Sequence, residues 1–148
     1  MSYTVTVVVF AEPQAVWARL TEVAGWPHWN PACVSAEAPE TFASGQRLRL
    51  QMRLPRGRAF WTTPVLIDLD QPRRLMWETR ALGLRAPTVT TLEPHDEGTL
   101  VTLTSESRGP LGFTYRLTFP EKTQAQMWSG ALTGLARSFD SAARGPGT

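Results

Sequence analysis

The sequence predicts an α+β domain in which a curved, seven-stranded antiparallel sheet wraps around one long C-terminal helix. Residues 47–54 alternate without a break between Arg or Gln and Leu or Met, the period of a strand with one buried face. Strands joined by short turns and followed by a separate helix are typical of this class. The helix is predicted from about residue 120 to residue 143 by an apolar stripe at helical spacing. That stripe consists of Trp128, Leu132, Leu135 and Phe139.

The N-terminal part of the chain predicts a strand, two short helices and a second strand. Residues 3–10 are mostly β-branched and too few for a helix. Pro13 suits the first position of a helix, and Gly25 ends it. Residues 26–31 contain two prolines, which leave room for one short helical turn before a weak strand at residues 33–38.

Five further strands are predicted at residues 47–54, 60–70, 75–80, 86–93 and 99–107, with short turns between them. Pro64 cannot donate a backbone hydrogen bond, so it indicates a sheet edge or a bulge. Residues 109–119 carry two glycines and are either a lid or a plain connector. We expect one ligand-binding domain over residues 1–144 and a frayed tail over residues 145–148.

Composition and charge exclude several classes of protein. A single cysteine, Cys33, rules out an internal disulfide, and no apolar run is long enough to cross a membrane as a helix. The net charge is +2, but the arginines are scattered among acidic residues rather than gathered in the stripe of a nucleic-acid binder. The densest group, at positions 47, 49, 53, 56 and 58, is typical of a solvated strand and its turn. We expect a cytoplasmic monomer or weak homodimer, without nucleic acid or integral membrane association.

Four segments together resemble the START/Bet v 1-like (SRPBCC) superfamily, also called the polyketide cyclase/dehydrase and lipid transport family. They are residues 11–17 (AEPQAVW), 26–31 (WPHWNP), 70–77 (DQPRRLMW) and 98–102 (GTLVT). The resemblance implies a helix-grip fold with a cavity between the curved sheet and the C-terminal helix. It leaves the function open, because members include lipid carriers, hormone receptors, aromatic polyketide cyclases and co-chaperones.

Strand alternation and the helical stripe predict a mainly apolar pocket with hydroxyl groups toward one end, as small-molecule sites often have. The same positions are equally those of a packed core. Tryptophans are good candidates because a large flat ring can line a cavity. The predicted ligand-binding residues are Leu50, Met52, Trp61, Trp77, Thr79, Thr88, Thr90, Ser105, Tyr115, Phe119, Trp128 and Leu132.

No catalytic or metal-binding constellation is evident in the sequence. Every strand carboxylate falls on an outer face by alternation, and His28 and His95 are the only histidines. One cysteine and two distant histidines do not form a zinc or iron–sulfur site, and we expect no cofactor. We therefore expect binding of a hydrophobic small molecule, such as a lipid, a quinone or a polyketide-like aromatic. The alternatives are a cyclase or dehydratase acting in the same cavity and a co-chaperone-like interaction module.

Overall fold

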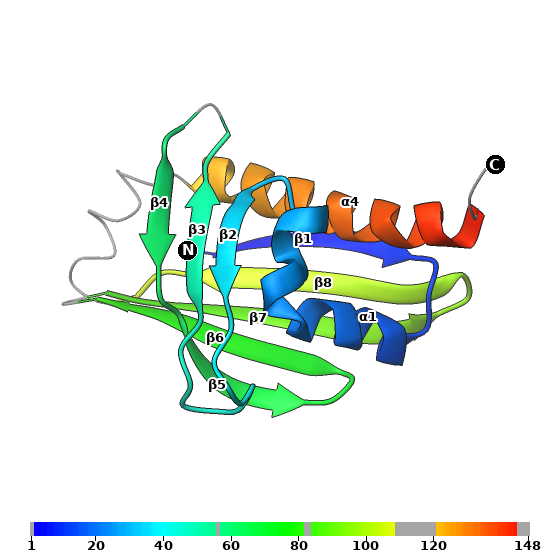
Figure 1. The fold of residues 1–148 in the computed structure, drawn as a ribbon, viewed down its shortest axis with the longest axis horizontal. Coiled ribbons are helices and arrows are strands. Elements are labelled where there is room, and N and C mark those ends of the chain that lie inside the picture. Colours follow the sequence, from blue (N-terminus) through cyan, green and yellow to red (C-terminus); the bar gives the residue numbers. More distant parts are fainter. Residues whose placement is uncertain (1, 56, 82–83, 109–120, 145–148) are drawn as a thin grey trace.

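The computed structural model describes residues 2–55, 57–81, 84–108 and 121–144 (Figure 1). The possible lid at residues 109–119 and the tail at residues 145–148 lie outside these ranges. The elements, in chain order, are β1 (Ser2–Val9), α1 (Pro13–Thr21), the 3-10 turn η1 (Val23–Gly25), α2 (Trp26–Trp29), β2 (Cys33–Glu37), β3 (Arg49–Arg53), β4 (Ala59–Thr62), β5 (Val65–Asp70), β6 (Arg74–Ala81), β7 (Leu84–His95), β8 (Gly98–Glu106) and α4 (Glu121–Arg144).

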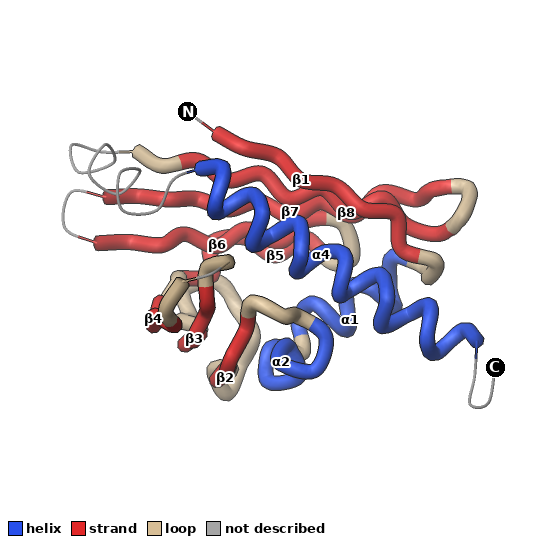
Figure 2. Tube along the Cα trace, turned by 90° about the horizontal axis from the view of Figure 1, so that it is seen from above, coloured by secondary structure: helices blue, strands red, loops and turns tan. Residues whose placement is uncertain are grey.

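The strands form a five-stranded antiparallel sheet in the order β1-β8-β7-β6-β5 and a three-stranded sheet in the order β2-β3-β4. Helix α4 packs along β1 and also contacts α2. Figure 2 shows α4 between the five-stranded sheet and a second layer made of β2–β4, α1 and α2. The antiparallel α+β architecture with a long C-terminal helix and two short helices after β1 is therefore confirmed.

The prediction of one seven-stranded sheet is wrong, because the expected strand at residues 60–70 is divided in two. Pro64 has no amide hydrogen to donate, and the chain leaves the ladder there, so β4 ends at Thr62 and β5 begins at Val65. In the described part of the chain, no regular ladder joins the two sheets, and the segment before β3 connects them through a few backbone contacts with residues 64 and 65. Leu48 N donates to Pro64 O at 3.0 Å, and Arg47 forms an isolated bridge with Val65.

Two register shifts change which side chains face outward. Between Cys33 and Ser35 the pairing of β2 with β3 shifts, and Val34 is left 42% exposed. On β5 the register shifts between Leu66 and Asp68, and Leu66 is fully buried. Without this shift, residues would alternate regularly from the buried Val65, and Ile67 rather than Leu66 would face the core.

The core fills the space between the two layers. In α1 the apolar residues Val16, Trp17 and Leu20 recur at helical spacing and are buried against the sheet. Trp26 is almost fully buried, and its indole nitrogen donates to the Leu20 carbonyl oxygen at 3.0 Å. This bond satisfies the one polar atom of a large apolar side chain and ties α2 to the end of α1.

Candidate functional site

A cavity of about 60 Å³ lies between the inner face of β3–β4, the five-stranded sheet and the first turns of α4. The strands supply most of its wall, because alternate residues of β3 and of β4 point inward. Leu50 and Met52 on β3 pair with Thr62 and Phe60 on β4, and all four line the cavity. The complete lining is Tyr3, Leu50, Met52, Leu54, Phe60, Thr62, Pro64, Trp77, Thr79, Ala86, Thr88, Ser105, Gln124, Met127 and Trp128.

One lateral row of the five-stranded sheet supplies three of the polar side chains of the lining, Tyr3, Thr88 and Ser105. The register places Tyr3 opposite Ser105, Ser105 opposite Thr88, and Thr88 opposite Trp77. The Thr88 and Ser105 hydroxyl oxygens are 3.1 Å apart, and Ser105 also donates to the Pro87 carbonyl at 3.3 Å. Neighbouring strands thus bring together hydroxyl groups that are far apart in the sequence.

Helix α4 contributes a buried amide to the same polar region. Gln124 is 7% exposed, and its Oε1 accepts a hydrogen bond of 3.1 Å from the Tyr3 hydroxyl. Gln124 and Trp128 are four residues apart on the helix, so both project to the same side, toward the cavity. The cavity therefore has an amide and three hydroxyl groups close together in its wall, two further hydroxyls at Thr62 and Thr79, and apolar side chains elsewhere.

Four tryptophans form a continuous chain that begins at the cavity wall. Trp128 and Trp77 line the cavity with ring centroids 5.8 Å apart. The next steps, from Trp77 to Trp26 and from Trp26 to Trp29, are also 5.8 Å each, with tilted rings. Such tilted aromatic pairs stabilise a core beyond their area of contact, so the rings hold the wall in place.

The cavity brings together most of the residues that the sequence predicted as ligand-binding, whose role in binding stays a prediction. Trp61 does not line it, because Trp61 pairs with the outward-facing Gln51 and is 48% exposed. Thr90 and Leu132 are buried but do not line the cavity either. Tyr115 and Phe119 lie outside the described residues. The predicted residues that line the cavity are Leu50, Met52, Trp77, Thr79, Thr88, Ser105 and Trp128.

Sequence reasoning missed several lining residues, and some had a usable signal. Gln124 precedes Trp128 by four residues on the predicted apolar stripe, and Tyr3 begins the alternation of β1. Phe60 had no such signal, since only the pairing of Phe60 with Met52 shows which face of β4 is inward.

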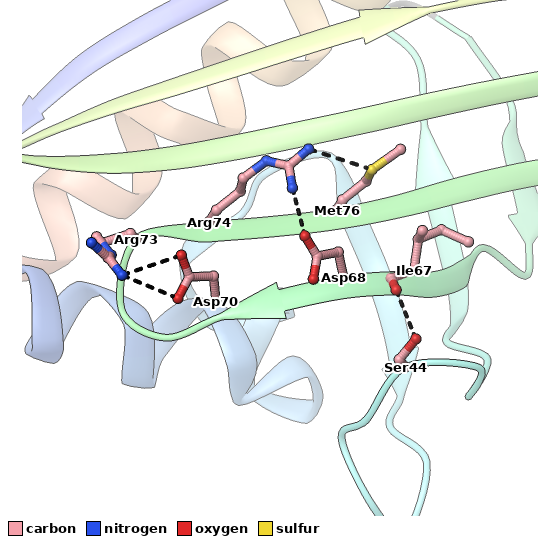
Figure 3. Close-up of polar contacts among 7 residues, drawn as sticks. All are labelled: Ser44, Ile67, Asp68, Asp70, Arg73, Arg74 and Met76. Carbon is pink, nitrogen blue, oxygen red and sulfur yellow. Dashed lines mark hydrogen bonds and ion pairs between the residues drawn. The ribbon is translucent and has the colours of Figure 1, made fainter.

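Among the described residues, the lining contains no Asp, Glu, Lys, Arg or His. Five strand carboxylates that are not part of the lining are each paired with an arginine: Glu37, Asp68, Asp70, Glu78 and Glu106. Figure 3 shows two of these pairs, Asp68 with Arg74 and Asp70 with Arg73. Their N···O distances are 2.5 Å and 3.5 Å, respectively. The described ranges also contain no cluster of three or more His, Cys, Asp or Glu residues able to hold a metal ion.

The only cysteine is buried on β2 and is not activated as a nucleophile. Its Sγ donates to the Ser35 carbonyl oxygen at 3.4 Å. Burial raises the pKa of the Cys33 thiol to about 11, so the thiol is neutral at ordinary pH. Cys33 is therefore a small core residue.

A sequence model of the family described as polyketide cyclase / dehydrase and lipid transport matches residues 1–140. The chain belongs to this family. The resemblance to the START/Bet v 1-like superfamily is thus confirmed over nearly the whole sequence. Among curated proteins, no significant match is found. In the ranges that the structure describes, no helix combines the length and the apolar character needed to cross a membrane.

Several solved structures share the fold of this chain. Protein NE0264 from Nitrosomonas europaea superposes with a TM-score of 0.76 at 17% identity, covering 98% of this chain and 97% of that one. The di-domain ARO/CYC BexL from the BE-7585A biosynthetic pathway gives 0.76 at 17% identity, covering 95% of this chain and 50% of that one. The AHSA1-like protein from Aeromonas hydrophila gives 0.71 at 18% identity, covering 100% and 98%. At such identities the likeness shows the fold alone.

Proposed function

We propose that the protein binds a hydrophobic small molecule in the cavity, with an uncharged polar group of the ligand placed among Tyr3, Thr88 and Ser105. The observation that carries this proposal is the composition of the lining: apolar and aromatic walls, neutral hydrogen-bonding groups and, among the residues that the structure describes, no Asp, Glu, His, Lys or Arg. Burying a charged ligand group there, with no opposite charge, costs far more than burying a hydroxyl or carbonyl that is hydrogen-bonded. The ligand class is therefore a neutral lipid, an isoprenoid quinone or a polyketide-like aromatic.

The cavity has to enlarge when such a ligand enters. Its volume of about 60 Å³ is well below the roughly 300 Å³ or more of sites for drug-sized ligands. Met52 and Met127 supply unbranched, adaptable side chains on facing elements. Phe60 lies on β4, one of the two edge strands of the three-stranded sheet. We expect the ligand to enter the cavity when Phe60 and β4 move outward.

A pair of ligands that differ only in charge tests the proposal. Farnesol and farnesoic acid share one apolar chain, and we expect the alcohol to bind at least about tenfold more tightly at neutral pH, which is about 1.4 kcal/mol. Titration followed by tryptophan fluorescence and by calorimetry measures both affinities. Equal or tighter binding of the acid, or no binding of farnesol, menadione or a neutral aromatic polyketide, would refute it.

A matched pair of variants locates the polar contact. Ser105→Ala removes a hydroxyl from the cavity, whereas Thr102→Val removes one from the same strand outside the cavity. We expect Ser105→Ala to weaken farnesol binding several-fold, by about the 1 kcal/mol of one net hydrogen bond, while Thr102→Val leaves it unchanged. Equal effects of the two substitutions would place the ligand elsewhere.

A second candidate function is cyclisation or dehydration of a reactive polyketide chain in the same cavity. It is favoured by the hydroxyl groups of Tyr3, Thr79, Thr88 and Ser105, which all line this cavity, and by the fold shared with the ARO/CYC protein BexL. Such a site would act by holding the chain in a folded geometry while hydroxyl groups or water move protons. Incubation with a poly-β-keto thioester tests it: formation of aromatic product no faster than without protein would exclude this candidate.

A further inference from the structure

The outer face of the three-stranded sheet carries an unusual set of exposed side chains, which we call the arginine–tryptophan face: Val34, Arg47, Arg49, Arg53 and Trp61. Four of these residues lie on strands β2, β3 and β4, and Arg47 lies two residues before the start of β3. The described chain leaves only three large apolar side chains exposed, and two of them, Val34 at 42% and Trp61 at 48%, belong to this face.

Positive charge on this face is only partly neutralised. Arg49 pairs with Glu37 at 3.2 Å, both side chains being more than half exposed, and its Cζ lies 4.2 Å from the centre of the Trp61 ring. Among the described residues, Arg47 and Arg53 have no acidic partner. By contrast, Arg73 and Arg74 on the β5–β6 hairpin are each paired with an aspartate (Figure 3).

Exposed tryptophan beside arginine is the combination that favours the boundary between lipid and water. The indole ring places its apolar body among the acyl chains and its N–H at the headgroups. Each arginine near an anionic bilayer adds attraction, and the attraction falls within a Debye length. A single ring that already lies under the Arg49 guanidinium is a poor platform for stacking several nucleic-acid bases.

We propose that the arginine–tryptophan face docks the protein on an anionic lipid bilayer, with Trp61 and Val34 entering the headgroup region and the arginines contacting lipid phosphates and carboxylates. The inner faces of the same strands line the cavity through Leu50, Met52 and Phe60. Docking therefore places the cavity wall formed by β3 and β4 against the bilayer, in which apolar ligands dissolve. This last step rests on the proposed function, whereas the docking itself does not.

Sedimentation with lipid vesicles tests the docking. The protein is expected to bind vesicles of phosphatidylcholine with about one third phosphatidylserine, not pure phosphatidylcholine, and to dissociate as NaCl rises from about 0.1 M to about 0.5 M. Each arginine should contribute about fivefold, so Arg49→Gln/Arg53→Gln should lower the partition coefficient about 25-fold. The control Arg85→Gln/Arg137→Gln removes equal charge from exposed positions outside the face and should keep nearly wild-type binding.

Trp61→Ala supplies an independent readout, because it removes apolar contact without changing charge. It should weaken vesicle binding several-fold and abolish the quenching of fluorescence by brominated lipid. Thermal unfolding of each variant establishes that it is folded, as substitution of exposed side chains should change stability little. Quenching that persists without Trp61 would overturn the proposed orientation.

Three results would overturn the proposal: no binding of the wild type to anionic vesicles at low salt, an equal loss in the face and control variants, or binding of polyuridylate or polyglutamate without vesicle binding. The last would assign the face to a nucleic acid or to an acidic protein. Farnesol titration without vesicles separates this proposal from the proposed function. The face variants should bind farnesol like the wild type, so either function can fail without the other.

Discussion

Gly134 on α4 lies where this helix approaches α2 most tightly, and Gly134→Ala tests that approach. A methyl group on Gly134 would overlap the Trp29 carbonyl oxygen and lie 3.1 Å from Pro31 Cδ. The oxygen belongs to the backbone at the end of α2 and cannot turn away by a rotamer change. In a free helix the same substitution stabilises by about 1 kcal/mol. Here α4 must move away from α2, and overpacking of this kind costs about 3 kcal/mol at the upper end of its range.

The net expectation is a loss of about 2 kcal/mol, which lowers the Tm by about 4–8 °C for a chain of this size. Urea unfolding followed by far-ultraviolet circular dichroism measures the free energy directly. Because Met127 and Trp128 lie about two turns away on α4 and line the cavity, farnesol affinity should also fall. The two effects together would show that the contact between α2 and α4 sets the position of the cavity wall.

Gly130 provides a matched control one turn earlier on α4. The nearest atom to a methyl group there is Pro31 Cγ at 3.9 Å, an ordinary contact, so Gly130→Ala should stabilise by up to about 1 kcal/mol. The two substitutions should therefore change the free energy of unfolding in opposite directions. This expectation would be refuted if Gly134→Ala were as stable as the wild type or more stable.

Three further predictions concern the core and the cavity. Ser105→Ala leaves the buried Thr88 hydroxyl without its partner and should cost about 1–3 kcal/mol, and adding Thr88→Val should recover part of that loss in urea unfolding. Burial raises the pKa of the Cys33 thiol from 9.0 to about 11 in the folded protein, so the thiol of the unfolded chain ionises first as pH rises. Between pH 9 and pH 11 the wild type should therefore lose stability relative to Cys33→Ala. Urea midpoints of the two proteins that change equally with pH would contradict this. Trp128→Phe should remove most of the fluorescence change on ligand binding and Trp61→Phe little of it.

The elements themselves could be predicted from local patterns. The alternation at residues 47–54 correctly placed Leu50 and Met52 on the inner face of β3, and Pro13 begins α1 as expected. Pro64 was recognised as an interruption, but its consequence depends on what the two halves of the chain pair with afterwards. Since β4 pairs with β3 and β5 pairs with β6, the interruption separates two sheets.

The candidate site was only partly predictable. The alternation along a strand predicts which residues face inward, but it does not predict which of them lie side by side with residues of the neighbouring strands. Thr88 and Thr90 share one face of β7, yet only Thr88 lies in the row that crosses the cavity, opposite Ser105 and Trp77. Thr90 pairs with Leu75 and Leu103 in the next row, within the packed core.

The sequence by itself determined the α+β class, the long C-terminal helix and the apolar character of the inner face, because hydrophobic periodicity acts within each element. Tertiary structure decided which hydroxyls meet, how closely α4 approaches α2, and that Trp61 faces outward beside Arg49. These features depend on register and packing between residues far apart in the chain. No local period encodes them, since a shift of one residue in pairing moves every side chain of a strand to the other face.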